Sequence, residues 1–101
     1  MQAVNIDNSA IEQLNPLTKN WTIYPNPLRD QQLMISLEME RASWLKCSVL
    51  NVVGQEVWQE QFLVNTGNNK LTIANQQWPA GIYTLTIQDE SAIQSKQFVK
   101  L

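Results

Sequence analysis

Histidine is absent from this 101-residue chain, and cysteine occurs only once. Without histidine, the chain lacks the side chain that most often serves as a general base and as a metal ligand. The single cysteine, Cys47, has no partner for an internal disulfide and no imidazole to activate it as a nucleophile. Its phase in an alternating segment predicts that it is buried as a small apolar side chain. We therefore expect neither a catalytic centre nor a metal site.

Charge is also scarce. Seven Lys and Arg residues against nine Asp and Glu residues give a net charge of −2 and a charged fraction of 16%, against roughly 25% in typical soluble domains. No basic cluster occurs, which argues against binding of nucleic acid through bulk charge. No run of about 18 apolar residues exists, so no membrane span is predicted. Residues 1–20 lack a basic region followed by an apolar stretch, and if the domain is exported we expect its signal peptide to lie on a part of the protein missing from this sequence.

Glycine is rare as well, with three residues that stand alone, so no glycine-rich phosphate loop is present. Carboxylates occur in three close pairs that could in principle act as acid and base. We interpret them as a solvated strand face and a turn. A calcium site built from Asp89, Glu90 and loop carbonyls is the less favoured alternative. No cofactor is expected. The pairs are Glu38 with Glu40, Glu56 with Glu60, and Asp89 with Glu90.

What the chain does contain is a series of short segments with a hydrophobic period of two. Such segments at roughly ten-residue spacing, with no long helix, predict an all-β, seven-stranded antiparallel immunoglobulin-like β-sandwich. Tyr83, near the start of the sixth segment, is predicted to form a tyrosine corner. The predicted strands are residues 21–24, 33–39, 45–50, 57–63, 71–73, 82–88 and 93–101.

Turn-forming residues separate these segments. The Val53-Gly54-Gln55 segment predicts a tight hairpin turn in which Gly54 supplies a positive φ, and Gly81 is likewise expected to meet a turn requirement. Asn65–Asn69 is predicted to be a loop from its composition. Residues 1–20 are interpreted as a linker with a short helical turn near residues 9–14, and residues 21–101 as the folded domain.

Four tryptophans leave two interpretations open. Trp44 and Trp58 are placed on strand edges or on faces opposite the core, and Trp21 and Trp78 near strand ends. They either pack the corners and rim of a small sandwich or form a contact patch for carbohydrate or a protein partner.

Five motifs in order give the chain a family resemblance. The chain from about Trp21 to Leu101 resembles the type A C-terminal sorting domain of type IX secretion cargo. Two motifs differ from the usual pattern, since Leu50-Asn51 replaces an aromatic-Asp pair and Trp78 replaces a leucine. The motifs are Tyr24-Pro25-Asn26-Pro27, Leu33–Leu37, Val49–Val57 with Gly54, the Trp78–Ile87 corner with Pro79, Gly81 and Tyr83, and the terminal run of Lys96, Gln97, Phe98, Val99, Lys100 and Leu101.

The resemblance implies a non-catalytic signal that directs a larger cargo across the bacterial outer membrane. Its implied partners are an outer-membrane shuttle, a cysteine-type sortase and cargo domains that precede it. The sortase usually removes such a domain near its N-terminal border, which here is residues 1–20. The implied path runs through the periplasm to the cell surface or the medium. The terminal run Lys96–Leu101 is the expected recognition surface, because an edge strand offers unpaired backbone groups for strand addition.

Two other functions remain open from the residues alone. One is an accessory module that binds glycan through Trp44, Trp58 or Trp78. The other is a retained structural spacer that docks a protein partner. A strand-swapped dimer is also open, because an edge strand at a chain end is easily exchanged.

Overall fold

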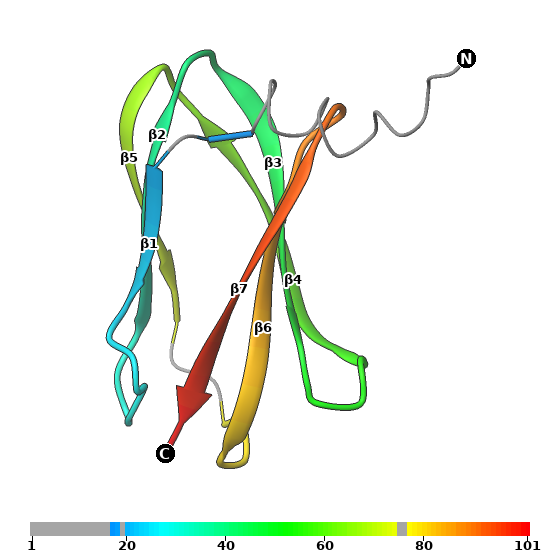
Figure 1. Ribbon diagram of the computed structural model, residues 1–101. Helices are drawn as coiled ribbons and strands as arrows, with labels where there is room; N and C mark the ends of the chain where they lie inside the picture. Colours follow the sequence, from blue (N-terminus) through cyan, green and yellow to red (C-terminus); the bar gives the residue numbers. More distant parts are fainter. Residues whose placement is uncertain (1–16, 19, 75–76) are drawn as a thin grey trace, which may run out of the picture.

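The computed structural model describes residues 17–18, 20–74 and 77–101, and over these residues the chain forms seven strands without a helix (Figure 1). Every pairing between strands is antiparallel, which confirms the predicted all-β fold class. The described part of the chain therefore offers no helix of the length and apolarity needed to cross a membrane. The helical turn expected near residues 9–14 lies outside the described residues. The strands are β1 (Asn20–Tyr24), β2 (Leu33–Met39), β3 (Ser43–Leu50), β4 (Glu56–Val64), β5 (Gly67–Ile73), β6 (Gly81–Gln88) and β7 (Ile93–Lys100).

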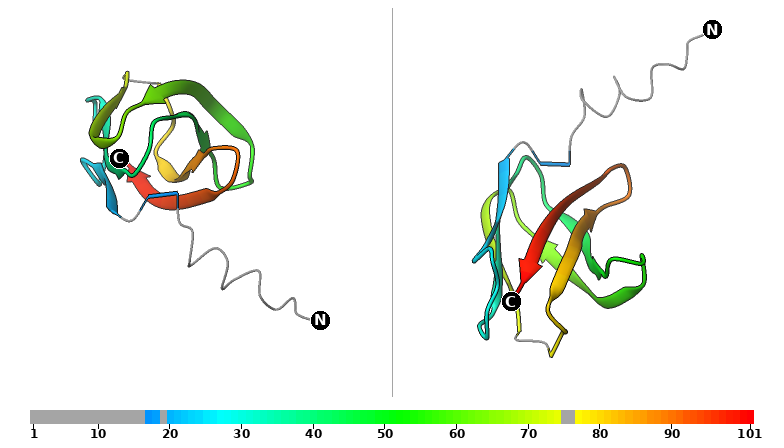
Figure 2. Two further views of the ribbon diagram at one scale, coloured as in Figure 1. Left: turned by 90° about the horizontal axis from the view of Figure 1, so that it is seen from above. Right: turned by 60° about the horizontal axis from the view of Figure 1, so that its bottom comes forward.

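The strands form two sheets that face each other across one core (Figures 1 and 2). The smaller sheet has the order β1-β2-β5, and the larger has the order β4-β3-β6-β7. In constant-type immunoglobulin domains the fourth strand lies in the sheet of the first, second and fifth strands. Here β4 pairs with β3 instead, so that β4 and β7 become the two edges of the larger sheet.

The core follows from the period-two pattern, because alternate side chains of a strand point to the same face. Ten inward apolar side chains of β2, β3 and β6 are buried. These three strands supply most of the buried apolar side chains of the core. Full burial of one such side chain contributes roughly 1.5–3 kcal/mol to the free energy of folding. The buried residues are Leu33, Ile35, Leu37 and Met39 of β2, Leu45, Cys47 and Val49 of β3, and Tyr83, Leu85 and Ile87 of β6.

The segment Asn65–Asn69 differs from its prediction as a loop. Strand β5 begins already at Gly67, which pairs with Met39. The Asn69 side chain holds the entry to the strand, because its Nδ2 donates to Asn65 O at 2.8 Å and its Oδ1 accepts from Asn65 N at 3.0 Å. Gly67 has a φ of 97°, a conformation that glycine adopts without strain. Turn-forming composition was therefore overridden by pairing with β2.

The turn between β3 and β4 agrees with its prediction. Gly54 has a φ of 87°, and its N–H donates to Asn51 O at 2.9 Å. The Asn51 Oδ1 accepts hydrogen bonds from Val53 N at 3.1 Å and Gln55 N at 2.9 Å. This is the turn geometry that asparagine stabilises with its own side chain, so the family difference at Asn51 preserves the turn.

The expectation that Gly81 meets a turn requirement is wrong. Gly81 is the first residue of β6 and is not among the glycines with positive φ. A Cβ placed there would meet only Tyr83 Cε2, at 3.9 Å, which is an ordinary contact. Neither the backbone conformation nor the surrounding space requires glycine at this position.

Candidate recognition surface at the last strand

The six residues expected to form a recognition surface do not share one face. Of the described strands, β7 pairs with β6 alone, so it is an edge of the larger sheet. Phe98 and Lys100 point inward and are 1% and 8% exposed, whereas Gln97 and Val99 face solvent. In the folded domain, a partner can therefore reach the outer edge of β7 but not the Phe98 side chain.

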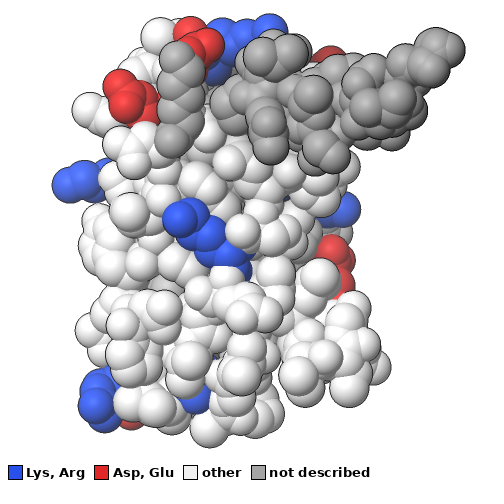
Figure 3. Space-filling model, viewed as in Figure 1, with Lys and Arg blue, Asp and Glu red and all other residues white. Residues whose placement is uncertain are grey.

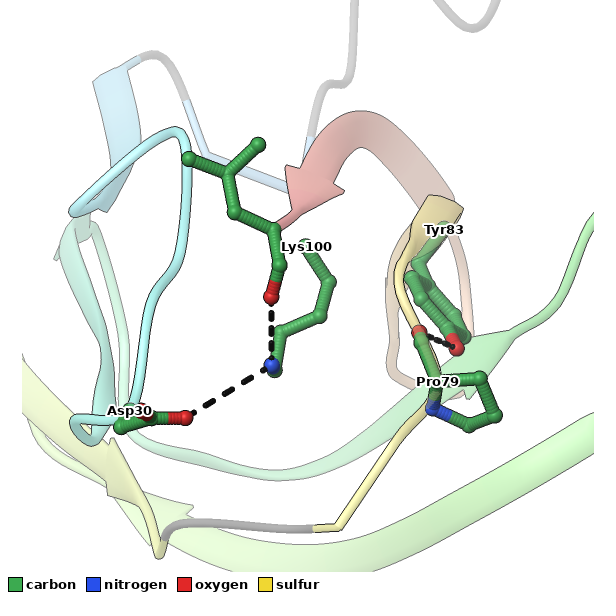
Figure 4. A network of polar contacts seen from close by, with 5 residues as sticks. Asp30, Pro79, Tyr83 and Lys100 are labelled. Carbon is green, nitrogen blue, oxygen red and sulfur yellow. Dashed lines mark hydrogen bonds and ion pairs between the residues drawn. The ribbon is translucent and has the colours of Figure 1, made fainter.

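Phe98 belongs to an aromatic cluster at the end of the core. Its ring lies 5.6 Å from the ring of Tyr83 and 6.1 Å from the ring of Trp78. The Tyr83 hydroxyl donates to the backbone oxygen of Pro79 at 2.5 Å (Figure 4). This bond back along the chain is the predicted tyrosine corner. Tyr83 and Pro79 thus hold the entry to β6, and we interpret them as structural residues.

The motif after β1 is bonded to the end of β7. The Asn26 Oδ1 accepts from Val99 N at 3.1 Å. Leu28 N donates to Val99 O at 2.7 Å, and Leu101 N donates to Leu28 O at 2.8 Å. We call these three hydrogen bonds among Asn26, Leu28, Val99 and Leu101 the terminal clamp. At this end the clamp occupies the backbone groups of Val99 and Leu101, so the unpaired backbone groups expected of an edge strand are confined to the earlier part of the terminal run.

The Lys100 side chain lies on the inner face of β7, at the end of the sandwich. Its Nζ donates to Leu101 O at 2.8 Å and lies 4.0 Å from Asp30 Oδ1 (Figure 4). Burial of an ammonium group requires such partners, while the apolar stem of the side chain packs against the core. Lys100 is thus engaged within the domain.

Lys96 is different, because this residue is exposed. Its Nζ lies 5.3 Å from the centroid of the Trp21 ring, and Trp21 itself is buried in the core. A contact of this kind at an exposed site contributes roughly 0.5–1 kcal/mol. No acidic residue of the described ranges is paired with Lys96. The indole ring therefore positions a cation that faces solvent.

Between β1 and β7 lies an open groove along the seam of the two sheets. Figure 1 shows these two edge strands on the same side of the molecule, and Figure 3 shows that side as largely uncharged surface with isolated basic groups. The smaller sheet contributes one wall of the groove and β7 contributes the other. The lining residues are Thr22, Ile23, Asn26, Lys96 and Gln97.

The seam is closed at both ends of this groove. At one end the backbone N–H of Thr18 donates to Gln94 Oε1 at 2.8 Å. At the other end the terminal clamp holds Val99. We call the segment of the β7 edge between Gln94 and Val99 the edge window.

Two residues of the edge window direct their backbone groups away from β6. Because N–H and C=O directions alternate along an antiparallel strand, and Val99 bonds outward to the clamp, Ser95 and Gln97 also direct their backbone groups outward. No described residue forms a backbone hydrogen bond with these outward groups. As far as the described residues are concerned, the window is thus a short stretch of unpaired strand edge.

The remaining chemical candidates have structural roles. Cys47 is fully buried, and that burial, together with the negative charge of Glu60, raises the pKa of its thiol to about 12. A thiol with so high a pKa is neutral and unreactive at physiological pH. The Asp89 Oδ1 accepts from the backbone N–H groups of Ser91 at 2.8 Å and Ala92 at 3.0 Å, which closes the β6–β7 turn. No group of three or more potential ligands that could hold a metal ion occurs among the described residues.

The tryptophans do not form a common platform. Trp44 is 62% exposed on β3. Trp58 was placed on an edge or on a face away from the core, but it packs partly buried against the core, as does Trp78. Corner and rim packing therefore accounts for all of these side chains except Trp44.

Sequence reasoning did not predict three contacts that shape the groove: Trp21 beneath Lys96, Thr18 with Gln94, and Asn26 with Val99. The Pro-Asn-Pro motif indicated a turn. That the Asn26 side chain carries a hydrogen-bond acceptor between two prolines was the one local sign that it could bond to another segment. Each of the three contacts joins segments more than 70 residues apart, which no local pattern reveals.

Comparison with known proteins identifies a family. Residues 22–101, which include every strand apart from the first two residues of β1, match the family described as the secretion system C-terminal sorting domain. No curated protein matches the chain.

Proposed function

The chain belongs to the family of secretion-system C-terminal sorting domains and carries a sorting signal of the type IX secretion system, and on this premise we propose that the outer edge of its last strand is what the secretion machinery reads. A signal of this kind directs export across the outer membrane and interacts with the type IX machinery. Domains of this family are in general non-catalytic.

One observation carries the proposal. Of the six residues in the terminal run, the buried Phe98 and Lys100 are engaged inside the domain, whereas the edge window presents unpaired backbone and the exposed Lys96. An unpaired edge is a surface to which another strand can add. The domain is then a substrate of the export machinery and not itself an enzyme.

The finer steps of export form part of the same proposal. Residues 21–101 are the sorting domain, and residues 1–20 link it to the cargo domains that precede it. An outer-membrane shuttle engages the domain after its passage through the periplasm. A cysteine-type sortase then cuts within residues 1–20 at the cell surface. The cargo is left on the surface or in the medium.

A reporter fusion tests this function. A fluorescent cargo with its own signal peptide is joined to residues 1–101 and expressed in a host that has the type IX system. Export of the full fusion, and its retention in a strain that lacks the system, is the expected result. Retention of the full fusion in the periplasm of the intact host contradicts the proposed function.

Deletion of residues 96–101 is a poor test, because it removes Phe98 from the aromatic cluster and more than half of β7 from its pairing with β6. Point variants on the outer edge keep the core and are preferable. Mass spectrometry of the mature parent protein tests the cleavage step, since loss of residues 21–101 supports removal and their retention supports the spacer. Gel filtration of the purified chain tests the strand-swapped dimer.

A further inference from the structure

The edge window of β7 combines three features that together specify a ligand: unpaired backbone groups, a fixed cation and a limited length. We propose that it binds one short extended segment of a partner protein, which adds to β7 as an antiparallel strand and places an aspartate or glutamate opposite Lys96. This inference rests on the proposed function, because it names the chemistry by which the machinery reads the signal.

The backbone groups set the mode of binding. Ser95 and Gln97 direct their N–H and C=O groups away from β6, and no described residue pairs with them. A strand that bonds to both residues gains main-chain hydrogen bonds independent of its sequence. Such binding suits a signal that must be read in the same way on many cargos.

The two closed ends set the length of the segment. The bond from Thr18 N to Gln94 Oε1 lies at one end, and the terminal clamp at Val99 lies at the other. At roughly 3.3 Å per residue, the stretch between them spans about 16 Å. An added strand of about five residues fits this space, whereas a longer one meets the clamp.

Lys96 sets the chemistry of the segment. The backbone groups of Lys96 bond to β6. Lys96 would therefore face the central residue of the added strand as a non-hydrogen-bonded pair, the kind of pair in which the two side chains approach most closely. Its ammonium group is held over Trp21 at 5.3 Å on the groove side and is paired with no acidic residue of the described ranges. A carboxylate on the central residue of the added strand meets it directly.

The surroundings add a second preference. The groove wall next to Lys96 includes Ile23 and Thr22 of the smaller sheet, which suits small apolar or hydroxyl side chains two positions before or after the carboxylate, because those positions share its face. On the outer face, Ser95 Oγ lies 3.2 Å from Thr86 Oγ1, and this hydroxyl pair offers no charge. The expected segment is therefore an acidic residue flanked by residues typical of β-strands.

The experiment uses proline to remove one outward N–H group without touching the pairing with β6. In the reporter fusion, Gln97→Pro deletes such a donor at the window, because proline is tolerated where the N–H faces away from the sheet. Gln61→Pro is its matched control. Gln61 lies on β4, the opposite edge strand, at a position whose backbone also points outward.

Charge is tested in parallel. Lys96→Glu reverses the proposed contact, and Lys70→Glu makes the same change at an exposed position of β5. We expect export to fall about fivefold or more with Gln97→Pro and with Lys96→Glu, as loss of one interfacial hydrogen bond or ion pair predicts. We expect wild-type export with both controls. The melting temperature of each purified variant shows whether it folds, and Ser95→Pro replaces Gln97→Pro if the latter does not.

The outcomes separate the two proposals. Retention of the unmodified fusion contradicts the proposed function. Export of the unmodified fusion together with unchanged export of the folded proline variant overturns strand addition and leaves the proposed function intact. Unchanged export of Lys96→Glu overturns the acidic partner residue.

Discussion

The side-chain oxygen of Asn26 accepts a hydrogen bond of 3.1 Å from the backbone N–H of Val99, a residue 73 positions later in the chain. This bond joins the Pro-Asn-Pro turn at the exit of the first strand to the end of the last strand. Asn26 therefore has a role beyond turn formation, since it holds the last strand in place and closes one end of the edge window.

Replacement of Asn26 by alanine is expected to lower the free energy of unfolding by about 1 kcal/mol, the typical contribution of one hydrogen bond. The amide of Val99 should also exchange faster with deuterium, because its acceptor is gone. Urea denaturation and site-resolved hydrogen exchange measure the two effects. Asn26→Asp keeps an acceptor oxygen and should protect Val99 as the wild type does. Equal exchange rates in the wild type and the alanine variant would show that the clamp does not hold Val99.

Tyr83→Phe is expected to cost roughly 1–1.5 kcal/mol, because it removes the hydroxyl that bonds to Pro79 O while the ring keeps its packing against Trp78 and Phe98. Tyr24→Phe is the matched control, since Tyr24 is exposed and its hydroxyl forms no hydrogen bond with any of the described residues. Thermal or urea unfolding followed by circular dichroism compares the two. Equal losses would argue against a tyrosine corner that stabilises the fold.

The two glycines of the family motifs should respond differently to alanine. Gly54→Ala places a Cβ on a residue with φ of 87° and should destabilise the domain by roughly 1–2 kcal/mol. Gly81→Ala should be close to neutral, because the nearest atom lies at 3.9 Å and the backbone is not left-handed. Paired denaturation curves test this contrast. A larger loss at Gly81 than at Gly54 would contradict it.

The thiol of Cys47 should resist thiol reagents in the native state. Its pKa is raised from 9.0 to about 12 by burial and by Glu60, so the reactive thiolate is scarce at pH 8. A raised pKa favours folding below pH 9, and this contribution is lost as the pH rises from about 9 to about 12. Reaction with a chromogenic disulfide, before and after addition of guanidinium, measures accessibility. Rapid labelling of the folded protein would contradict burial.

Much of the fold could be predicted because a strand is recognisable from the alternation of apolar and polar residues within its own sequence. Leu33, Ile35 and Leu37 alternate with polar residues, and this period places them on one buried face whatever the rest of the chain does. Gly54 was predictable in the same way, from the turn that it makes with its neighbours. The prediction of a loop at Asn65–Asn69 was wrong because these residues favour turns in isolation, whereas pairing with β2 extends β5 back to Gly67.

The recognition surface was only partly predictable. The terminal run pointed to β7, but the run itself does not say that Phe98 lies in the core or that Lys100 bonds to Leu101 O. Nor does it place Trp21 beneath Lys96. These contacts depend on how the two sheets come together, since each joins residues from different strands or from opposite ends of the chain.

Residue pattern alone thus determined the class of fold, the seven strands and the family of secretion-system sorting domains, because each depends on residues close together or on motifs in a fixed order. The tertiary structure decided which part of the last strand is open. Alternation assigns faces within a strand, but an edge is free or occupied according to what packs beside it. Here Asn26 and Leu28 occupy the end of β7, and Ser95 and Gln97 are left unpaired by the described residues.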